Sequence, residues 1–482
     1  VASGAASSPI NLAVGVNNVT TVITAPYGVT TRAYVVAITR EPWRGPFYVG
    51  PATGNDANGC EAWGAGYACA TLAGAVGKAV LPNTTIYLTG TTHSASNVTS
   101  ALALHFVGAG KESTIVNGSA GNRVFNLTGA GVTSSFQNLT VQNGSFTSGT
   151  NNHGAGLYAA GSLSLTNVNV LSNTTNSGSG AGVYAGQALT MSNVRVENNI
   201  ATVNVLGGGG GVYAQNGAVI AGSQFIRNQA QLGGGLYVVN GGAVITGTQF
   251  LSNTATNFAS AKGGGMYVQA SPASVTGSLF RGNAAVTGAG AYFQPIMTNT
   301  VSDSQFVANS ASAYGGGIAL ENATTVLNAT NVLLAGNTAG SGAAAINFGG
   351  GSLNYVTIAA PTTGTNSAIR FFGTAFTIRN SIVASYTTAF QMVSGAATAD
   401  YNLFYNTATT GVVTGVHSIT GTNPLFFDPA GGNYRLQPGS PAIGAGLAVR
   451  GITTDLAGLT RANPPSMGAY EDPFYPYDVN LT

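Results

Sequence analysis

The chain has 482 residues, too many for one ordinary compact core, and only 6% of them are charged, with a net charge of +2. Its 15 basic residues are scattered singly, which excludes the basic stripe that nucleic-acid binding requires. A 44% share of hydrophobic residues argues against disorder, and Ser, Thr, Asn and Gly interrupt every apolar run, which excludes a membrane span.

Residues 1–42 alternate apolar and polar side chains between turn signals at GVNN and APYG. This spacing predicts two or three strands of a small β-sandwich-like segment. The segment resembles the second half of the cadherin-like β-sandwich repeats of bacterial surface proteins, without the first half. Half a sandwich leaves open edges, so we expect either a larger parent chain or another segment that completes the domain. No signal-peptide pattern precedes it, and we expect a mature or excised product.

Residues 43–80 contain both cysteines of the chain, Cys60 and Cys69. No second pair exists to complete a zinc site, so the spacing predicts a local disulfide and an oxidising compartment; the alternative is two buried free thiols. We interpret Asp56 as an Asx-turn residue, the alternative being a metal ligand. The segment resembles the opening of secreted bacterial parallel β-helix proteins. That resemblance implies a first strand and a helix over 69–80 that caps the open end of the rod.

A repeat of about 27 residues runs through residues 81–430. Its fixed points are six asparagines, each with Val or Phe three residues earlier: Asn173, Asn199, Asn228, Asn253, Asn283 and Asn309. A segment of variable length follows each asparagine, then a glycine cluster and usually a tyrosine, in a column from Tyr158 to Tyr292. Short strands with alternating apolar and polar residues, and no convincing helix, are compatible with two folds, a propeller and a solenoid. The period is too short for a propeller blade, so we predict an all-β, right-handed parallel β-helix of about 13 coils.

Equivalent positions of successive coils lie above one another in such a fold. The four phenylalanines of the repeat are therefore expected to form an inward aromatic stack: Phe225, Phe250, Phe280 and Phe306. The asparagines are expected to form a hydrogen-bonded ladder that satisfies the polar groups of the corner. The tyrosine column is a platform for sugars if it points outward, and the alternative is structural stacking between coils.

The pairing of Phe-x-x-Asn with Gly-Gly-[Ala/Gly]-[Ile/Leu] resembles the repeat of the polymorphic outer-membrane proteins and related bacterial β-helix adhesins, over about residues 140–345. Residues 431–472, with Asp455, Arg461 and Glu471, resemble the closing segment of secreted β-helix proteins. That resemblance implies termination of the helix. The three charged residues are expected to form a buried ion-pair network, the alternative being a catalytic carboxylate pair. Residues 473–482 read as an extended tail, which we expect to pair with the N-terminal strands of a neighbouring copy.

The charged residues favour no active site. Glycoside hydrolysis needs two carboxylates, and Glu197 is the one acid between Glu112 and Asp303. The basic residues Arg195, Arg227 and Arg281 occupy different columns, and the four histidines (His93, His105, His153 and His417) lack a carboxylate or cysteine partner at motif spacing. We interpret His153 as a surface turn residue. We therefore predict no catalytic residue, no cofactor and no metal site.

We predict a secreted, extracellular, non-enzymatic structural or adhesive protein, the subunit of a surface fibre, filament or layer. Its expected partners are copies of itself joined head to tail, and glycans or a neighbouring cell surface, with no nucleic acid and no membrane span. The alternative is a carbohydrate-binding or polysaccharide-degrading β-helix protein with its site on the loops 199–209 and 253–263. Degradation at that site requires a carboxylate cluster beneath these loops.

Overall fold

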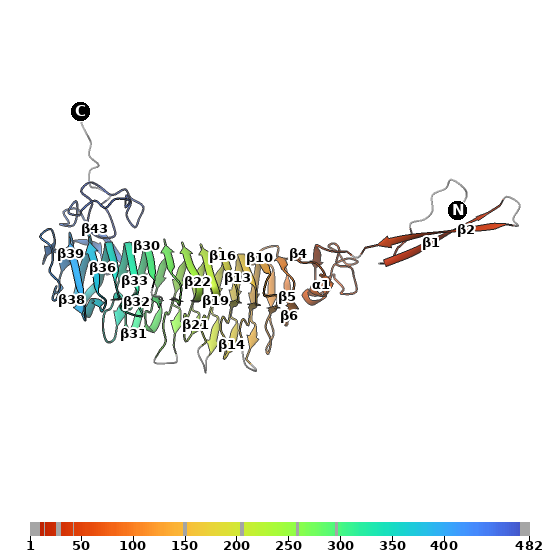
Figure 1. Ribbon diagram of the computed structural model, residues 1–482, viewed down its shortest axis with the longest axis horizontal. Coiled ribbons are helices and arrows are strands. Elements are labelled where there is room, and N and C mark those ends of the chain that lie inside the picture. The colour runs from red at the N-terminus through yellow and green to blue at the C-terminus, as the bar shows by residue number, and fades with distance from the viewer. Residues whose placement is uncertain are drawn as a thin grey trace, which may run out of the picture.

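A computed structural model describes residues 10–13, 15–25, 30–41, 43–147, 152–202, 207–256, 260–294 and 297–472. These residues form an elongated rod of stacked strands with a hairpin extending from its N-terminal end (Figure 1). No helix in these ranges is long and apolar enough to cross a membrane.

The N-terminal segment is a two-stranded antiparallel hairpin, β1 (Gly15–Thr24) and β2 (Thr31–Arg40). The alternation predicted from the sequence is present, but the described residues add no third strand and leave both faces in water, with Val36 57% exposed. An isolated hairpin of two strands is marginally stable in water. The expected pairing of this hairpin with residues 473–482 of a neighbouring copy concerns residues outside the described ranges.

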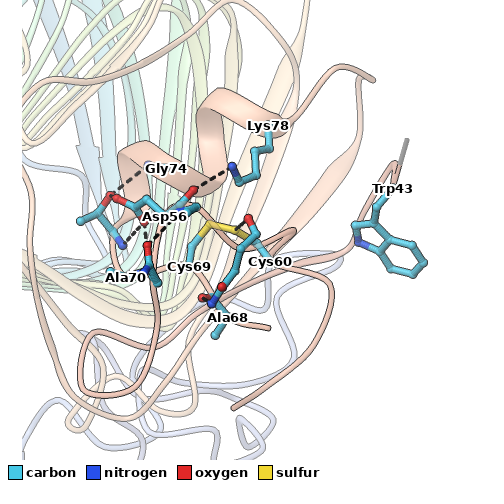
Figure 2. Close-up of a disulfide and its surroundings, with 12 residues drawn as sticks. Trp43, Asp56, Cys60, Ala68, Cys69, Ala70, Gly74 and Lys78 are labelled. Atoms are coloured by element: carbon cyan, nitrogen blue, oxygen red, sulfur yellow. Dashed lines mark hydrogen bonds between the residues drawn. A yellow bond between two sulfur atoms is a disulfide. The ribbon is translucent and has the colours of Figure 1, made fainter. Parts of the chain in front are cut away.

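A disulfide and a short helix close the N-terminal end of the rod (Figure 2). Strand β3 (Phe47–Val49) leads into a loop that the Cys60–Cys69 disulfide closes, which confirms the predicted disulfide. Helix α1 (Leu72–Lys78) is shorter than the predicted 69–80, and the side chain of Thr71 caps its start by accepting the N–H of Gly74.

Asp56 holds the start of this helix, and it is not the Asx-turn residue that we predicted. Its Oδ1 accepts the backbone N–H groups of Ala70 and Thr71, and its Oδ2 accepts the Thr71 hydroxyl. Asn55 makes the Asx turn instead, by accepting the N–H of Ala57. Partial burial raises the pKa of Asp56, but the hydrogen bonds from Thr71 and Ala70 outweigh it and leave the pKa below its ordinary value.

The rod is a parallel β-solenoid of about 11 turns, which confirms the predicted fold class. The complete turns are fewer than the expected 13 because β3 at one end and β39 to β41 at the other contribute strands to one or two faces only. Each turn contributes strands to three faces, which we call A, B and C in chain order.

Face A begins each turn and consists of β3, β4 (Thr84–Leu88), β7 (Leu104–Val107), β10 (Thr133–Gln142), β13 (Ser162–Leu171), β16 (Leu189–Ser192), the second half of β19 (Val212–Ala221) and of β22 (Leu236–Thr246), β26 (Ala273–Thr276), β30 (Thr298–Val307), β33 (Val326–Ala335), β36 (Gly351–Phe371), β37 (Ala375–Arg379) and β39 (Ala396–Asp400). The longer of these strands bend and continue into face B.

Face B also contains β5 (Thr92–Ser94), β8 (Ile115–Asn117), β17 (Arg195–Glu197), β20 (Gln224–Ile226), β23 (Gln249–Leu251), β27 (Leu279–Arg281), β38 (Ile382–Met392), β40 (Leu403–Tyr405) and β41 (Ile419–Thr420). Face C contains β6 (Val98–Ser100), β9 (Phe125–Leu127), β12 (Leu157–Ala159), β15 (Val183–Ala185), the first halves of β19 and β22, β25 (Met266–Val268), β29 (Ala291–Phe293), β32 (Ile318–Leu320), β35 (Ile346–Phe348) and the ends of β36 and β38.

A separate eight-stranded sheet lies between face B and face C in chain order. It consists of β11 (Ser145–Phe146), β14 (Thr174–Asn176), β18 (Ile200–Thr202), β21 (Gln229–Ala230), β24 (Thr254–Ala255), β28 (Ala284–Thr287), β31 (Ser310–Tyr314) and β34 (Thr338–Ala339).

The repeat residues form two continuous columns inside the rod. Phe225, Phe250, Phe280 and Phe306 stack with ring centroids 4.8, 4.5 and 4.5 Å apart. The asparagines are fully buried, and each amide N–H donates to the carbonyl of the next amide at 2.9–3.0 Å, from Asn173 through Asn199, Asn228, Asn253, Asn283 and Asn309 to Asn337. The ladder thus satisfies polar groups that water cannot reach.

The glycine cluster that precedes each tyrosine is required by close backbone contact. Gly233 has a φ of +58°, in the left-handed region. A Cβ on Gly234 would lie 2.5 Å from the Thr254 carbonyl oxygen, and one on Gly235 would lie 2.6 Å from that of Gly265. The cluster therefore serves the turn of the chain and provides no phosphate-binding loop.

The closing segment covers the last turns of face B, at the end drawn in blue (Figure 1). Strands β42 (Phe426–Asp428) and β43 (Asn433–Leu436) pair antiparallel, and the segment buries Tyr434 and Met467 against outward side chains such as Leu333 and Ile382. The closing segment thus shields from water the apolar side chains on the outer surface of the last turns.

Candidate functional site

The tyrosine column lies on the outer surface of face C. The residues on either side of each tyrosine belong to the main core, whereas the tyrosines point away from it. Tyr158, Tyr184 and Tyr213 are half-buried, and Tyr237, Tyr267 and Tyr292 are buried. Successive rings are parallel except at two steps, Tyr213–Tyr237 and Tyr267–Tyr292, where they meet edge to face. Stacked rings use their faces on one another, so the column presents mainly ring edges and hydroxyl groups.

The tyrosine hydroxyl groups follow one hydrogen-bond pattern. Four of the six donate to the side chain two residues after the column position of the next turn: Tyr184 to Gln215 at 3.2 Å, Tyr237 to Gln269, Tyr267 to Gln294 at 2.6 Å, and Tyr292 to Glu321. Burial raises the pKa of Tyr237, Tyr267 and Tyr292 well above the ordinary value. These phenols therefore stay neutral and act as hydrogen-bond donors.

A cavity of about 350 Å³ opens between this column and residues 260–262, which lie in the second of the two predicted site loops. Its wall consists of Gln231, Leu232, Tyr237, Ser260, Lys262, Tyr267 and Gln269. Gln231 is 4% exposed, and its amide nitrogen donates to the Ser260 hydroxyl at 3.4 Å. Its carbonyl oxygen is buried without a hydrogen-bond partner. An orphan acceptor of this kind in a polar cavity indicates a ligand or water that donates to it.

A charge pair closes one side of the cavity. Lys262 Nζ lies 2.8 Å from Glu321 Oε2 and 4.8 Å from the centroid of the Tyr292 ring. Among the described residues, Glu321 is the one carboxylate bonded to a residue of the cavity wall. The described residues of the cavity wall thus do not assemble the carboxylate cluster that degradation would require there.

A second charged group lies on face B, where two of the arginines that occupy different columns meet one carboxylate. Glu197 is almost buried, and both Arg195 and Arg227 form ion pairs with it. Arg227 also donates from Nε to Asn198 Oδ1 at 3.0 Å. The carboxylate is saturated by the two guanidinium groups, so the cluster ties neighbouring turns together.

The histidines are placed by tertiary contacts that the sequence did not reveal. His153 is not a surface turn residue: it is half-buried, stacks on Tyr184 and accepts the N–H of Ser179. Burial, and then the charge of Arg123, lower the pKa of His153. His417 pairs with Asp400, Nδ1 to Oδ2 at 2.9 Å, although 17 residues separate them in the sequence.

The Asp400–His417 pair lies at the C-terminal end of face A. Asp400 Oδ1 also accepts the backbone N–H groups of Tyr401 and His417. Partial burial raises the pKa of Asp400, but the hydrogen bonds from His417 and Tyr401 outweigh it and lower the pKa. The imidazole stacks on Tyr401 and is half exposed, and Arg379 is the register partner of Asp400 on β37.

The three predicted residues of the closing segment come together as a structural group. Arg461 Nη1 lies 3.7 Å from Glu471 Oε2 and its guanidinium stacks on the Tyr355 ring. Asp455 binds backbone N–H groups, including that of Glu471 at 2.8 Å, and makes no ion pair with Arg461. Glu471 in turn accepts the N–H of Ser466. The predicted three-member ion-pair network is thus one ion pair joined to a carboxylate that organises backbone.

The described residues contain no group of three or more His, Cys, Asp or Glu that could hold a metal ion.

No protein-family model matches the sequence, and no curated protein is significantly similar to it. Among solved structures, the chain is similar to the pectate lyase Pel9A, with 14% identity and a TM-score of 0.37 over 88% of this chain and 96% of that chain. It is also similar to the A-module of the mannuronan C-5 epimerase AlgE4 from Azotobacter vinelandii, with 11% identity and a TM-score of 0.26 over 71% and 89% of the two chains.

The comparison corrects one prediction. The sequence favoured a non-enzymatic structural or adhesive fibre subunit, whereas these two solved chains are a lyase and an epimerase. At these identities and TM-scores the likeness says nothing of chemistry, so any support for the carbohydrate alternative has to come from this chain's own residues.

Proposed function

We propose that this β-solenoid binds carbohydrate at the cavity between the tyrosine column and residues 260–262. The observation that carries the proposal is the composition of the wall, which combines the phenol rings of Tyr237 and Tyr267 with the amides of Gln231 and Gln269. Sugars present apolar ring faces and many hydroxyl groups, and sites of this mixed kind satisfy both. The carbonyl oxygen of Gln231 is buried in the wall without a partner, and a sugar hydroxyl would donate to it once the side chain turns toward the cavity.

With this function the protein would act outside the cell, where polysaccharide ligands occur. The Cys60–Cys69 disulfide supports this location, because such bonds persist in oxidising compartments.

Affinity electrophoresis and calorimetry against a panel of soluble polysaccharides test the proposal. Gln231→Ala combined with Gln269→Ala is expected to weaken binding at least about tenfold, the cost of one or two hydrogen bonds to a ligand. Gln305→Ala, at a half-buried glutamine on face B, is the matched control and leaves binding unchanged. Absence of binding by the wild-type chain across the panel would contradict the proposal.

Polysaccharide degradation is a second candidate, favoured by the Asp400–His417 pair. A carboxylate that holds Nδ1 orients the imidazole and directs Nε2 away from itself, which is how a general base is prepared. Release of reducing ends from a bound polysaccharide measures the activity. Asp400→Asn is expected to lower the rate about a hundredfold. His105→Gln, on face A at the other end of the rod, is the control, and equal rates in both variants would assign the pair a purely structural role.

A further inference from the structure

The polar atoms of the cavity wall differ in whether they can form a further hydrogen bond. Gln231 offers a buried acceptor without a partner. The Gln269 carbonyl already accepts the Tyr237 hydroxyl, and one of its lone pairs remains. Both carbonyl oxygens can therefore accept a hydrogen bond from a ligand hydroxyl, beside the donors that the wall itself supplies through Ser260, Lys262 and the amide nitrogens.

The one cation of the wall is already neutralised. Lys262 is held by Glu321 at 2.8 Å, and the same carboxylate oxygen accepts the hydroxyl of Tyr292. The lysine and glutamate side chains are 25% and 29% exposed, so water screens this pair only in part. A ligand carboxylate that entered here would meet the charge of Glu321 together with that of Lys262.

From this we infer that the cavity selects neutral glycans through their hydroxyl donors and that Glu321 excludes uronate chains by occupying Lys262. The inference rests on the proposed function and adds its substrate class. A neutral sugar loses no charge hydration on entering, whereas a carboxylate loses its hydration without gaining a free cation. A donor hydroxyl also satisfies Gln231, which a carboxylate, being an acceptor only, does not.

The test compares galactomannan and hydroxyethylcellulose, as neutral probes, with polygalacturonate and alginate, as acidic ones. Wild-type protein is expected to bind the neutral probes at least about tenfold more tightly. Glu321→Gln keeps an oxygen for the Tyr292 hydroxyl but frees the charge of Lys262, so acidic probes should gain about tenfold or more in affinity. In the double variant Glu321→Gln/Lys262→Met this gain should vanish. Gln231→Glu keeps acceptor oxygens, so it should retain neutral probes and reject acidic ones more strongly.

The outcomes separate this inference from the function on which it rests. If wild-type protein binds polygalacturonate or alginate as tightly as the neutral probes, or if Glu321→Gln brings no gain, the selectivity argument is overturned while carbohydrate binding stands. If wild-type protein binds none of the four probes, the proposed function fails with it. Circular dichroism and the thermal unfolding midpoint establish that each variant is folded before binding is compared.

Discussion

Replacing one rung of the asparagine ladder should destabilise the rod far more than its single side chain suggests. The carbonyl of Asn253 accepts both the backbone N–H and the amide N–H of Asn228, at 3.0 and 2.9 Å. Its amide nitrogen donates to the Phe225 carbonyl at 2.8 Å and to Asn283 at 3.0 Å. All of these asparagines are fully buried, so water cannot replace the lost partners.

In Asn253→Ala, four buried groups lose a partner: two N–H groups of Asn228, the Phe225 carbonyl and the Asn283 carbonyl, of which the last keeps the backbone N–H of Asn253. Each buried group left without a partner costs about 1–3 kcal/mol, so we expect a loss of about 5 kcal/mol in the free energy of unfolding. Because each turn of a solenoid contacts only its neighbours, the loss should concentrate in the turns of β20 to β28.

Urea unfolding measures the loss, and hydrogen exchange of the Asn228 amide locates it. Asn240→Ala, at an exposed asparagine on β22, is the control and should change stability by less than about 0.5 kcal/mol. A loss below about 1 kcal/mol for Asn253→Ala, with unchanged protection of the Asn228 amide, would refute the reasoning.

Three further predictions concern the cap, the tyrosine column and the closing segment. Cys60→Ala combined with Cys69→Ala removes a disulfide between cysteines nine residues apart, and should lower the free energy of unfolding by about 2–3 kcal/mol and raise hydrogen exchange in α1. A reducing agent should have no further effect on this variant. Burial, and then Tyr184, raise the pKa of Tyr213 to about 12, so the stability that this phenol contributes is present below pH 10 and is lost as the pH rises toward 12. Ultraviolet titration of the wild type against Tyr213→Phe measures this pKa, and a Tyr213 phenol that ionises near pH 10 would contradict the prediction. Arg461→Met leaves Glu471 buried without its cation and should cost about 3–5 kcal/mol in thermal unfolding, whereas the exposed Arg44→Met should cost almost nothing.

The repeat shows what the sequence by itself determined. Phe250 and Asn253 recur with their neighbours at a constant offset, and a solenoid stacks identical positions at the strand spacing. Local alternation and a fixed period therefore specified the solenoid, the aromatic stack and the ladder without knowledge of any distant contact. The cysteine pair was predictable for the same reason, because its partners are near in sequence.

The contacts of the candidate site depended on the tertiary structure. Lys262 meets Glu321 across 59 residues, and His417 meets Asp400 across 17, because segments of variable length set which side chains share a surface. The orientation of the tyrosines, outward from the core yet buried by their neighbours, also arises from the packing of several turns. A periodic pattern fixes the positions that repeat in every turn, whereas a binding cavity is made from the residues that do not repeat, and only the folded chain brings those together.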